Sequence, residues 1–207
     1  MATRGRFITL EGIDGAGKST HVAFLAEAIR ARGATVVATR EPGGTPLAEK
    51  VRELVLSMPM RHDSEVLLMF AARAEHVAQV IRPALARGDW VLCDRFTDAT
   101  FAYQGGGHGV DAAHIEALAR WTHADCMPDA TILFDVPPEV SRARLARAVD
   151  NGRTLDKFER EDAAFTARVR AVYQARAHAE PGRFRIVDST RPVDEVRLAL
   201  AAIIEAL

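Results

Sequence analysis

The fold of this chain is indicated first by the stretch "GIDGAGKST", residues 12–20. Gly12, Gly17, Lys18 and Ser19 satisfy the pattern G-x-x-x-x-G-K-[ST], which is typical of nucleotide-binding loops. The glycines let backbone N–H groups converge on phosphate oxygens, the lysine reaches the outer phosphates, and the serine hydroxyl is a ligand for Mg²⁺. The stretch therefore predicts a P-loop.

The segments on both sides of this stretch support that interpretation. The apolar run "FITLE", residues 7–11, comes directly before it, and residues 20–32 show the apolar spacing of an amphipathic helix. A strand that leads into the loop and a helix that leaves it are the context that the motif requires. The start of that helix also adds partial positive charge where phosphates would lie. A chance glycine-rich turn is the alternative, and this context disfavours it.

Five short apolar runs alternate with helical patterns along the chain. The runs predict buried strands over residues 7–12, 35–40, 90–95, 131–136 and 184–188. The helical patterns cover residues 20–32, the segment around Arg52, residues 63–87 with a kink at Pro83, residues 111–123 and residues 193–207. Such alternation predicts an α/β fold, a three-layer α/β/α arrangement around a five-stranded parallel sheet of the P-loop NTPase type.

Charged side chains stand where four of the predicted strands end. These residues are Glu11, Arg40, Asp94 and Asp135. Parallel sheets bind ligands beyond the carboxyl ends of their strands. We therefore expect the functional site at this edge of the sheet.

The composition is that of one soluble globular domain. The chain has 207 residues, of which 48% are hydrophobic and 27% charged. We expect a single domain over residues 1–207, with irregular segments at 105–109 and 147–161. A formal net charge of -1 excludes the strong basic field that gathers nucleic acid polymers.

The cysteines and the N-terminus bear on the compartment. Cys93 and Cys126 have no metal-ligand partners at a suitable spacing and suggest no disulfide framework. The first residues, "MATRGRFITLEG", show no signal-peptide pattern, and no apolar stretch is long enough to span a bilayer. We expect a cytoplasmic protein that has no membrane partner.

The P-loop alone leaves GTPases, ATPases and small-molecule kinases open. A GTPase would carry an N-K-x-D element, but the single asparagine, Asn151, is followed by glycine. A kinase with a phosphorylated acceptor must hold two anions together, which requires arginines and a divalent cation. Asp94 and Arg95, in "CDRF", are candidates for the carboxylate beside Mg²⁺ and for the guanidinium. A surface Asp–Arg pair is the alternative.

Four further motifs follow the P-loop in the order found in a known family. They are "TREPGGT" (39–45), "DRF" (94–96), "AYQGGG" (102–107) and "VDSTRP" (187–192). Together they resemble the bacterial thymidylate kinase family over essentially the entire chain. The resemblance implies a fold of the nucleoside monophosphate kinase type and phosphorylation of dTMP to dTDP, in dTTP biosynthesis, by the γ-phosphate of ATP with Mg²⁺ as cofactor. It also implies a homodimer, to which "EVLLMF" (65–70) is a candidate contributor.

The resemblance implies a set of residues for the acceptor nucleotide. They are Asp14, Glu41, Arg52, Phe70, Arg73, Arg95, Thr100, Tyr103 and Gln104. Asp14 would face the sugar near its 3′-hydroxyl, Phe70 would stack on thymine, Arg73 would bind a ring carbonyl and Gln104 would bind the pyrimidine edge. From pattern alone, Phe70 is typical of core, while Asp14 and Arg73 are typical of solvated positions.

One position departs from the family. Where the family usually has a serine, this chain has Ala99, so a hydroxyl contact to the base is either lost or supplied by Thr100. The resemblance also implies that Tyr103 lies against the sugar and favours deoxyribose.

The resemblance also implies residues for ATP, metal and catalysis. For ATP they are Gly12, Ile13, Asp14, Gly15, Ala16, Gly17, Lys18, Ser19, Thr20, Arg142, Arg144, Ser189, Thr190 and Arg191. For the metal they are Ser19, Asp94 and Glu41, and for catalysis Lys18, Arg95, Arg147 and Arg153.

The segment at about 141–161 resembles the family's mobile lid. Because Gly15 and Ala16 leave no arginine in the P-loop, the resemblance implies that a lid arginine is catalytic, with Arg147 and Arg153 as candidates. Lys157 stands where an arginine is more usual. A charged helix facing water is the alternative for the lid, as a capped turn is for residues 188–192.

Two other functions stay open at this point. A kinase for another nucleoside monophosphate or small metabolite would use the same scaffold. A regulator that binds ATP without an acceptor would need only the P-loop.

Overall fold

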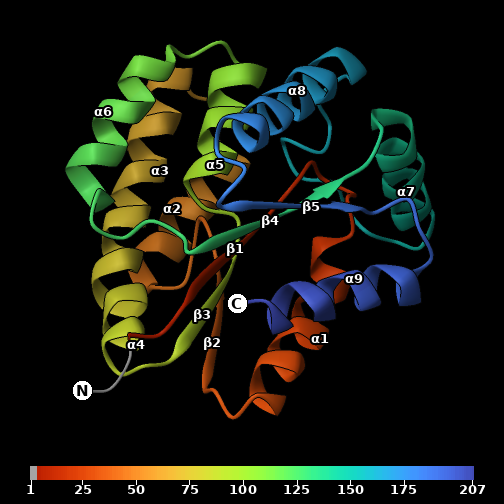
Figure 1. The fold of residues 1–207 in the computed structure, drawn as a ribbon. Helices are drawn as coiled ribbons and strands as arrows, with labels where there is room; N and C mark the ends of the chain where they lie inside the picture. Colours follow the sequence, from red (N-terminus) through yellow and green to blue (C-terminus); the bar gives the residue numbers. More distant parts are fainter. Residues whose placement is uncertain (1–3) are drawn as a thin grey trace.

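The computed structural model describes residues 4–207, and its centre is a five-stranded parallel sheet (Figure 1). The strands are β1 (Phe7–Glu11), β2 (Val36–Arg40), β3 (Trp90–Asp94), β4 (Ala130–Asp135) and β5 (Phe184–Asp188). Their order across the sheet is β2-β3-β1-β4-β5. The predicted fold class is confirmed. The expectation that no signal segment precedes β1 rests partly on residues 1–3, which lie outside the described residues.

Helices connect the strands. The α-helices are α1 (Lys18–Ala31), α2 (Pro46–Ser57), α3 (His62–His76), α4 (Arg82–Ala86), α5 (Thr97–Thr100), α6 (Ala112–His123), α7 (Pro138–Asp150), α8 (Ala163–Ala179) and α9 (Val193–Glu205). Two π-helical segments, η1 (Val77–Ile81) and η2 (Phe101–Gly107), continue α3 and α5. No helix among residues 4–207 combines the length and apolar composition that crossing a membrane requires.

The helices cover both faces of the sheet. Helices α1 and α9 pack on one face, whereas α4 and α8 pack on the other, with α3 and α6 beyond them (Figure 1). The alternation along β1 explains this arrangement, because side chains of a strand point to opposite faces. Ile8 and Leu10 share a core with Leu25 of α1, whereas the Phe7 ring packs edge-on against Phe96 at 5.0 Å.

The structure differs from the sequence prediction in three segments. Residues 105–107, expected to be irregular, end the π-helix η2, and residues 147–150, also expected to be irregular, belong to α7. Helix α8 was not predicted at all. It packs on η2, where a Cβ at Gly107 would lie only 2.4 Å from the Phe165 ring of α8. The glycines therefore serve close packing, which local sequence patterns do not reveal.

Candidate functional site

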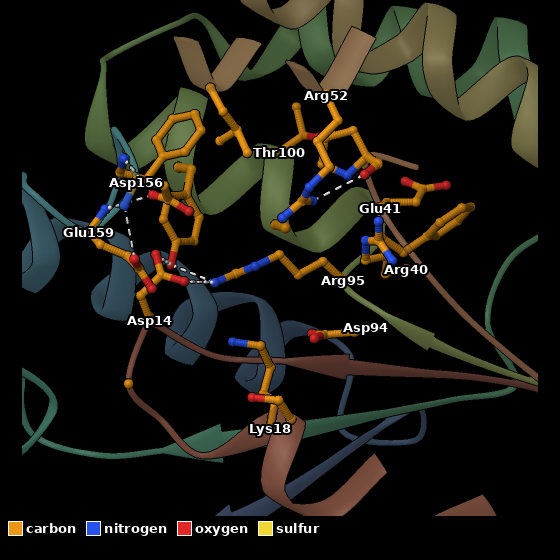
Figure 2. Close-up of a pocket in the computed structure, with 18 of the residues that line it drawn as sticks. Asp14, Lys18, Arg40, Glu41, Arg52, Asp94, Arg95, Thr100, Asp156 and Glu159 are labelled. Atoms are coloured by element: carbon orange, nitrogen blue, oxygen red, sulfur yellow. Dashed lines mark hydrogen bonds and ion pairs between the residues drawn. The ribbon is translucent and has the colours of Figure 1, made fainter. Parts of the chain in front are cut away.

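A cavity of about 370 Å³ lies between the P-loop, the ends of β2 and β3, and the lid segment (Figure 2). Its lining includes Asp14, Gly15, Gly17, Lys18, Ser19, Thr20, Arg40, Glu41, Arg52, Met69, Arg73, Asp94, Arg95, Phe96, Ala99, Thr100, Tyr103, Gln104, Arg144, Arg153, Asp156, Phe158 and Glu159. These residues are distant in sequence, and the parallel sheet brings them together at the edge where ligands of such sheets bind.

The P-loop begins in a conformation that only glycine adopts readily. Gly12 has φ +138°, and a Cβ there would lie 2.4 Å from the carbonyl oxygen of Phe134. Lys18 curls back over the loop, and its Nζ donates hydrogen bonds to the carbonyl oxygens of Gly12 (3.0 Å) and Ile13 (3.2 Å). Burial, together with the nearby Arg95 cation, lowers the pKa of Lys18. The ammonium group therefore lies inside the loop, beside the space that phosphates would fill.

The P-loop contacts the first turn of α7, at the start of the segment predicted to be the lid. Gly15 has φ +72°, and a Cβ there would lie 2.8 Å from the carbonyl oxygen of Ser141 in α7. The Ser141 hydroxyl donates to the carbonyl oxygen of Asp14 at 2.6 Å. A long side chain at position 15 would clash with this contact. The contact with α7 therefore leaves no room for an arginine side chain at position 15 of the loop.

Arg95 forms the centre of the site. Its Nη2 donates to Asp14 Oδ1 at 2.5 Å and to the Tyr103 hydroxyl at 2.9 Å (Figure 2). Its Nη1 donates to the carbonyl oxygen of Gly12 and to the Tyr173 hydroxyl, both at 3.1 Å. Burial disfavours both charges, but their mutual attraction outweighs it. The pKa of Arg95 consequently lies well above its usual value and that of Asp14 below it.

A buried carboxylic acid lies behind this arginine. Glu11 accepts hydrogen bonds from the Tyr173 hydroxyl at 2.8 Å and from the Phe96 backbone N–H at 2.7 Å. Arg95 itself has φ +70°, an uncommon conformation for a residue with a side chain. Glu11 therefore fixes the backbone just after Arg95 and, through Tyr173, its guanidinium. Burial raises the pKa of Glu11 to about 8.

The far side of the cavity contains a buried ion pair. Arg73 Nε donates to Glu41 Oε2 at 2.7 Å, and its Nη2 donates to the Thr100 hydroxyl at 3.0 Å. His76 Nδ1 lies 2.9 Å from the other oxygen of Glu41. Burial opposes ionisation of Glu41, but the Arg73 cation outweighs it and lowers the pKa of Glu41. The Arg73 Nη1 is buried and has no hydrogen-bond partner among residues 4–207.

Two further polar side chains line the same side. Arg52 donates from Nη1 to the carbonyl oxygen of Pro42 at 3.1 Å (Figure 2). Burial is the main cause that lowers the pKa of Arg52, and the positive charge of Arg40 adds to it. Gln104 is almost fully buried and donates from Nε2 to Glu65 Oε1 at 2.8 Å. Phe70, in contrast, does not line the cavity. It packs with Val66 and Ile115 behind the wall, under the Arg73 guanidinium at 4.7 Å from its ring centroid.

The lid arginines differ in where they lie. Arg144 lines the cavity and donates to the carbonyl oxygens of Gly15 and Ala16, both at 3.3 Å. Arg153 also lines it and forms an ion pair with Glu159. Arg147 is exposed and is not part of the lining, and Arg142 faces a small hollow of about 20 Å³ behind the loop. The structure thus brings Arg144 and Arg153 to the site.

The turn after β5 touches the P-loop through one residue. The Ser189 hydroxyl donates to the carbonyl oxygen of Ala16 at 2.5 Å, and its own carbonyl oxygen accepts from Arg144 Nη2 at 2.6 Å. Thr190 and Arg191 instead bond to Asp188 and are exposed. The capped-turn interpretation describes the local contacts of these two residues.

The residues predicted to bind a metal differ in whether their oxygen atoms already have hydrogen-bond partners. Asp94 Oδ1 is buried without a hydrogen-bond partner in the described part of the chain, and it lines the cavity near Lys18. Ser19 is exposed on the same side. Both oxygens of Glu41 are already engaged by Arg73 and His76. Within residues 4–207 there is no cluster of three or more acidic, histidine or cysteine side chains placed to hold a metal.

Comparison with known proteins identifies the family. The family model described as "Thymidylate kinase" matches residues 10–199. This chain belongs to the thymidylate kinase family. It is 65% identical to the thymidylate kinase of Bordetella petrii over 207 residues, covering 100% of this chain and 98% of that protein. It is 61% identical to that of Methylobacillus flagellatus, covering 94% of each. The crystal structure of the Ehrlichia chaffeensis thymidylate kinase superimposes with a TM-score of 0.79 at 35% identity, covering 98% of this chain and 99% of that one.

Several cavity residues of this thymidylate kinase fold were not predicted from the sequence. Phe158 and Glu159 come from the lid, and Met69 comes from α3. Tyr173, which supports Arg95, lies on α8, for which no helix had been predicted. Two residues carried a signal: Arg40, which lines the cavity, ends the second predicted strand, and Glu11, which lies behind Arg95, ends the first.

Proposed function

We propose that this chain transfers the γ-phosphoryl group of ATP to dTMP, giving ADP and dTDP. The observation that carries the proposal is the position of Arg95 in a single cavity. On one side of its guanidinium lie Lys18 and the P-loop, and on the other lies the buried pair Arg73–Glu41. Two anionic substrates that meet there would share one cation between them.

The donor half consists of the P-loop and the lid residues that touch it. The loop N–H groups, Lys18 and the start of α1 would hold the ATP phosphates. When phosphates enter, Lys18 exchanges the carbonyl oxygens of Gly12 and Ile13 for phosphate oxygens. Arg144 and Ser189 tie the loop to α7 and to the turn after β5, and would position the nucleoside end.

The acceptor half is lined by groups suited to a pyrimidine nucleotide. Arg73 Nη1 is an unused buried donor and would bond to a ring carbonyl. Gln104 would bind the adjacent ring edge, and Tyr103 with Asp14 would face the sugar. Arg52 would bind the acceptor phosphate. Phe70 would act indirectly, because its ring supports the Arg73 guanidinium, which lies over the rings of both Phe70 and Phe96.

Mg²⁺ is the cofactor that this chemistry calls for. Asp94, with its unpartnered buried oxygen, and the Ser19 hydroxyl would hold it, whereas Glu41 serves to position Arg73. The ion would neutralise charge on the phosphate oxygens. The nucleophile is a phosphate oxygen that is already ionised near neutral pH, because a phosphate monoester has a second pKa of about 6. No general base is needed, and catalysis rests on alignment and charge neutralisation.

The protein also presents an apolar surface suited to a homodimer. Helices α2 and α3 pack together, and large apolar side chains on these helices and just after α2 are exposed: Leu47, Leu54, Met58 and Leu67. Such surfaces on soluble proteins mark interaction sites. Leu67→Glu should shift the sedimenting species from dimer to monomer. A wild-type protein that sediments as a monomer would contradict this part of the proposal.

An acceptor panel tests the proposed function directly. The rate of ADP formation is measured with dTMP, dUMP, dCMP and AMP as acceptors. We expect the highest kcat/KM with dTMP. Equal rates with all four would favour a kinase for another acceptor, and ATP binding without turnover of any of them would favour a regulator.

A further inference from the structure

The carboxylate of Glu65 is buried behind the acceptor side of the cavity and has no part in the mechanism above. It belongs to the first turn of α3, its side chain is fully buried, and it does not line the cavity. Oε1 accepts the hydrogen bond from Gln104 Nε2 at 2.8 Å, and Oε2 pairs with Lys157 Nζ of the lid. Burial of a charge is costly unless the charge is paired, so the two contacts of this carboxylate offset the cost of burying it.

The chemistry of this contact fixes the orientation of the Gln104 amide. A carboxylate paired with an ammonium group accepts hydrogen bonds, so the end of the Gln104 amide that faces Glu65 is the NH₂ group. The carbonyl end, Oε1, accepts no hydrogen bond from the described residues, and Gln104 lines the cavity. Gln104 therefore offers the cavity an acceptor. Without Glu65, either end of the amide would be able to face a ligand.

Lys157 is the cation that pairs with Glu65. His108 is the other basic group nearby, with Nε2 3.7 Å from Glu65 Oε1, and its ring stacks on that of His62 at 4.0 Å. Burial lowers the pKa of His108, so its imidazole is neutral at neutral pH. The positive partner of Glu65 is consequently the lid lysine.

We propose that Glu65 is a specificity-determining positioning residue, which holds the Gln104 amide with its carbonyl toward the acceptor base and so selects a base that presents an N–H group there. This inference rests on the proposed function. Thymine and uracil carry a hydrogen on the ring nitrogen N3, whereas cytosine carries a lone pair at the same position. A fixed carbonyl accepts from the first two bases and repels the third. Sites built around a required hydrogen bond discriminate strongly against ligands that lack it.

The test compares kcat/KM for dTMP, dUMP and dCMP in the wild type and in Glu65→Gln. The glutamine side chain can present either its oxygen or its NH₂ group to Gln104, which frees the Gln104 amide to flip. We expect the ratio of dTMP to dCMP to fall by about tenfold or more. The ratio of dTMP to dUMP should not change, since both bases carry the N–H group. A role for Glu65 in stability alone would lower activity with all three acceptors by the same factor.

Two further variants make the outcome decisive. Lys157→Gln removes the ion pair but leaves the carboxylate, so it should keep the ratio of dTMP to dCMP within about threefold of the wild type. Gln104→Leu removes the amide and should reduce the ratio as Glu65→Gln does, which keeps the test available if Glu65→Gln does not fold. If the ratio of kcat/KM for dTMP to that for dCMP stays within about threefold of the wild-type ratio in Glu65→Gln or in Gln104→Leu, this inference alone is overturned. A wild type with no preference overturns the proposed function, and the inference with it.

Discussion

Arg95 Nη2 lies 2.5 Å from Asp14 Oδ1, so the guanidinium in the centre of the cavity is held by the P-loop itself. The acidic residue within a phosphate-binding loop is explained by this contact. Asp14 directs its charge toward a cation on β3's carboxyl end rather than into the loop. The P-loop thereby positions the arginine that would stand between the two substrates.

Replacement of Arg95 should affect catalysis more than folding. Arg95→Ala removes the central cation and leaves Asp14 unpaired, so we expect kcat to fall on the order of 10³-fold. The measurement is steady-state kinetics with ATP and dTMP at saturation. Arg87→Ala, which removes an exposed arginine paired with Asp89, is the control and should retain activity. An Arg95→Ala enzyme within about tenfold of the wild type would contradict the assigned role.

The lid arginines should differ in their effect on kcat. Arg153 lines the cavity whereas Arg147 is exposed outside it, so Arg153 is the better placed to reach a transferring phosphoryl group. We expect Arg153→Ala to lower kcat on the order of 10²-fold and Arg147→Ala to lower it by less than about threefold. The measurement is kcat of each single variant by steady-state kinetics. The opposite order would assign the catalytic role to Arg147.

Arg73 should control acceptor binding through its geometry rather than its charge. Arg73→Lys keeps a cation but cannot contact Glu41 and Thr100 and still present a free donor, because lysine lacks the planar fork. We expect the KM for dTMP to rise about tenfold to 100-fold, while the KM for ATP stays near that of the wild type. Equal increases in both KM values would indicate a general loss of structure instead.

Glu11 should make stability depend on pH. Its pKa is about 8 in the folded protein against an ordinary value of 4.5, so the folded state binds the proton more tightly than the unfolded state. The stability contribution is present below pH 4.5 and is lost as pH rises through 8, on the order of 5 kcal/mol in total. Urea unfolding of the wild type and Glu11→Gln between pH 5 and pH 8.5 measures it. The free energy of unfolding should fall with pH in the wild type and less in the variant; parallel curves would contradict the raised pKa.

Much of the site was visible in the sequence because its motifs are local. The P-loop, "DRF" and "AYQGGG" each place several site residues within a few positions, and strand ends predicted the edge of the sheet where they meet. The structure differs from the sequence-based expectations where tertiary contacts set the local arrangement. Gly106 and Gly107 of the π-helix η2 pack closely on α8, and Phe70 lies behind the wall because its face of α3 packs on Ile115 of α6.

The amino-acid sequence by itself determined the parallel α/β fold, the family and the phosphate-binding loop, since each depends on short-range spacing of apolar, glycine and charged residues. Only the tertiary structure decided which partners those residues take. Arg95 meets Asp14 across 81 positions, Gln104 meets Glu65 across 39, and Lys157 meets Glu65 across 92. Hydrogen bonds of this kind depend on how whole elements pack, because the atoms come within reach only after the core has set the distances between strands and helices.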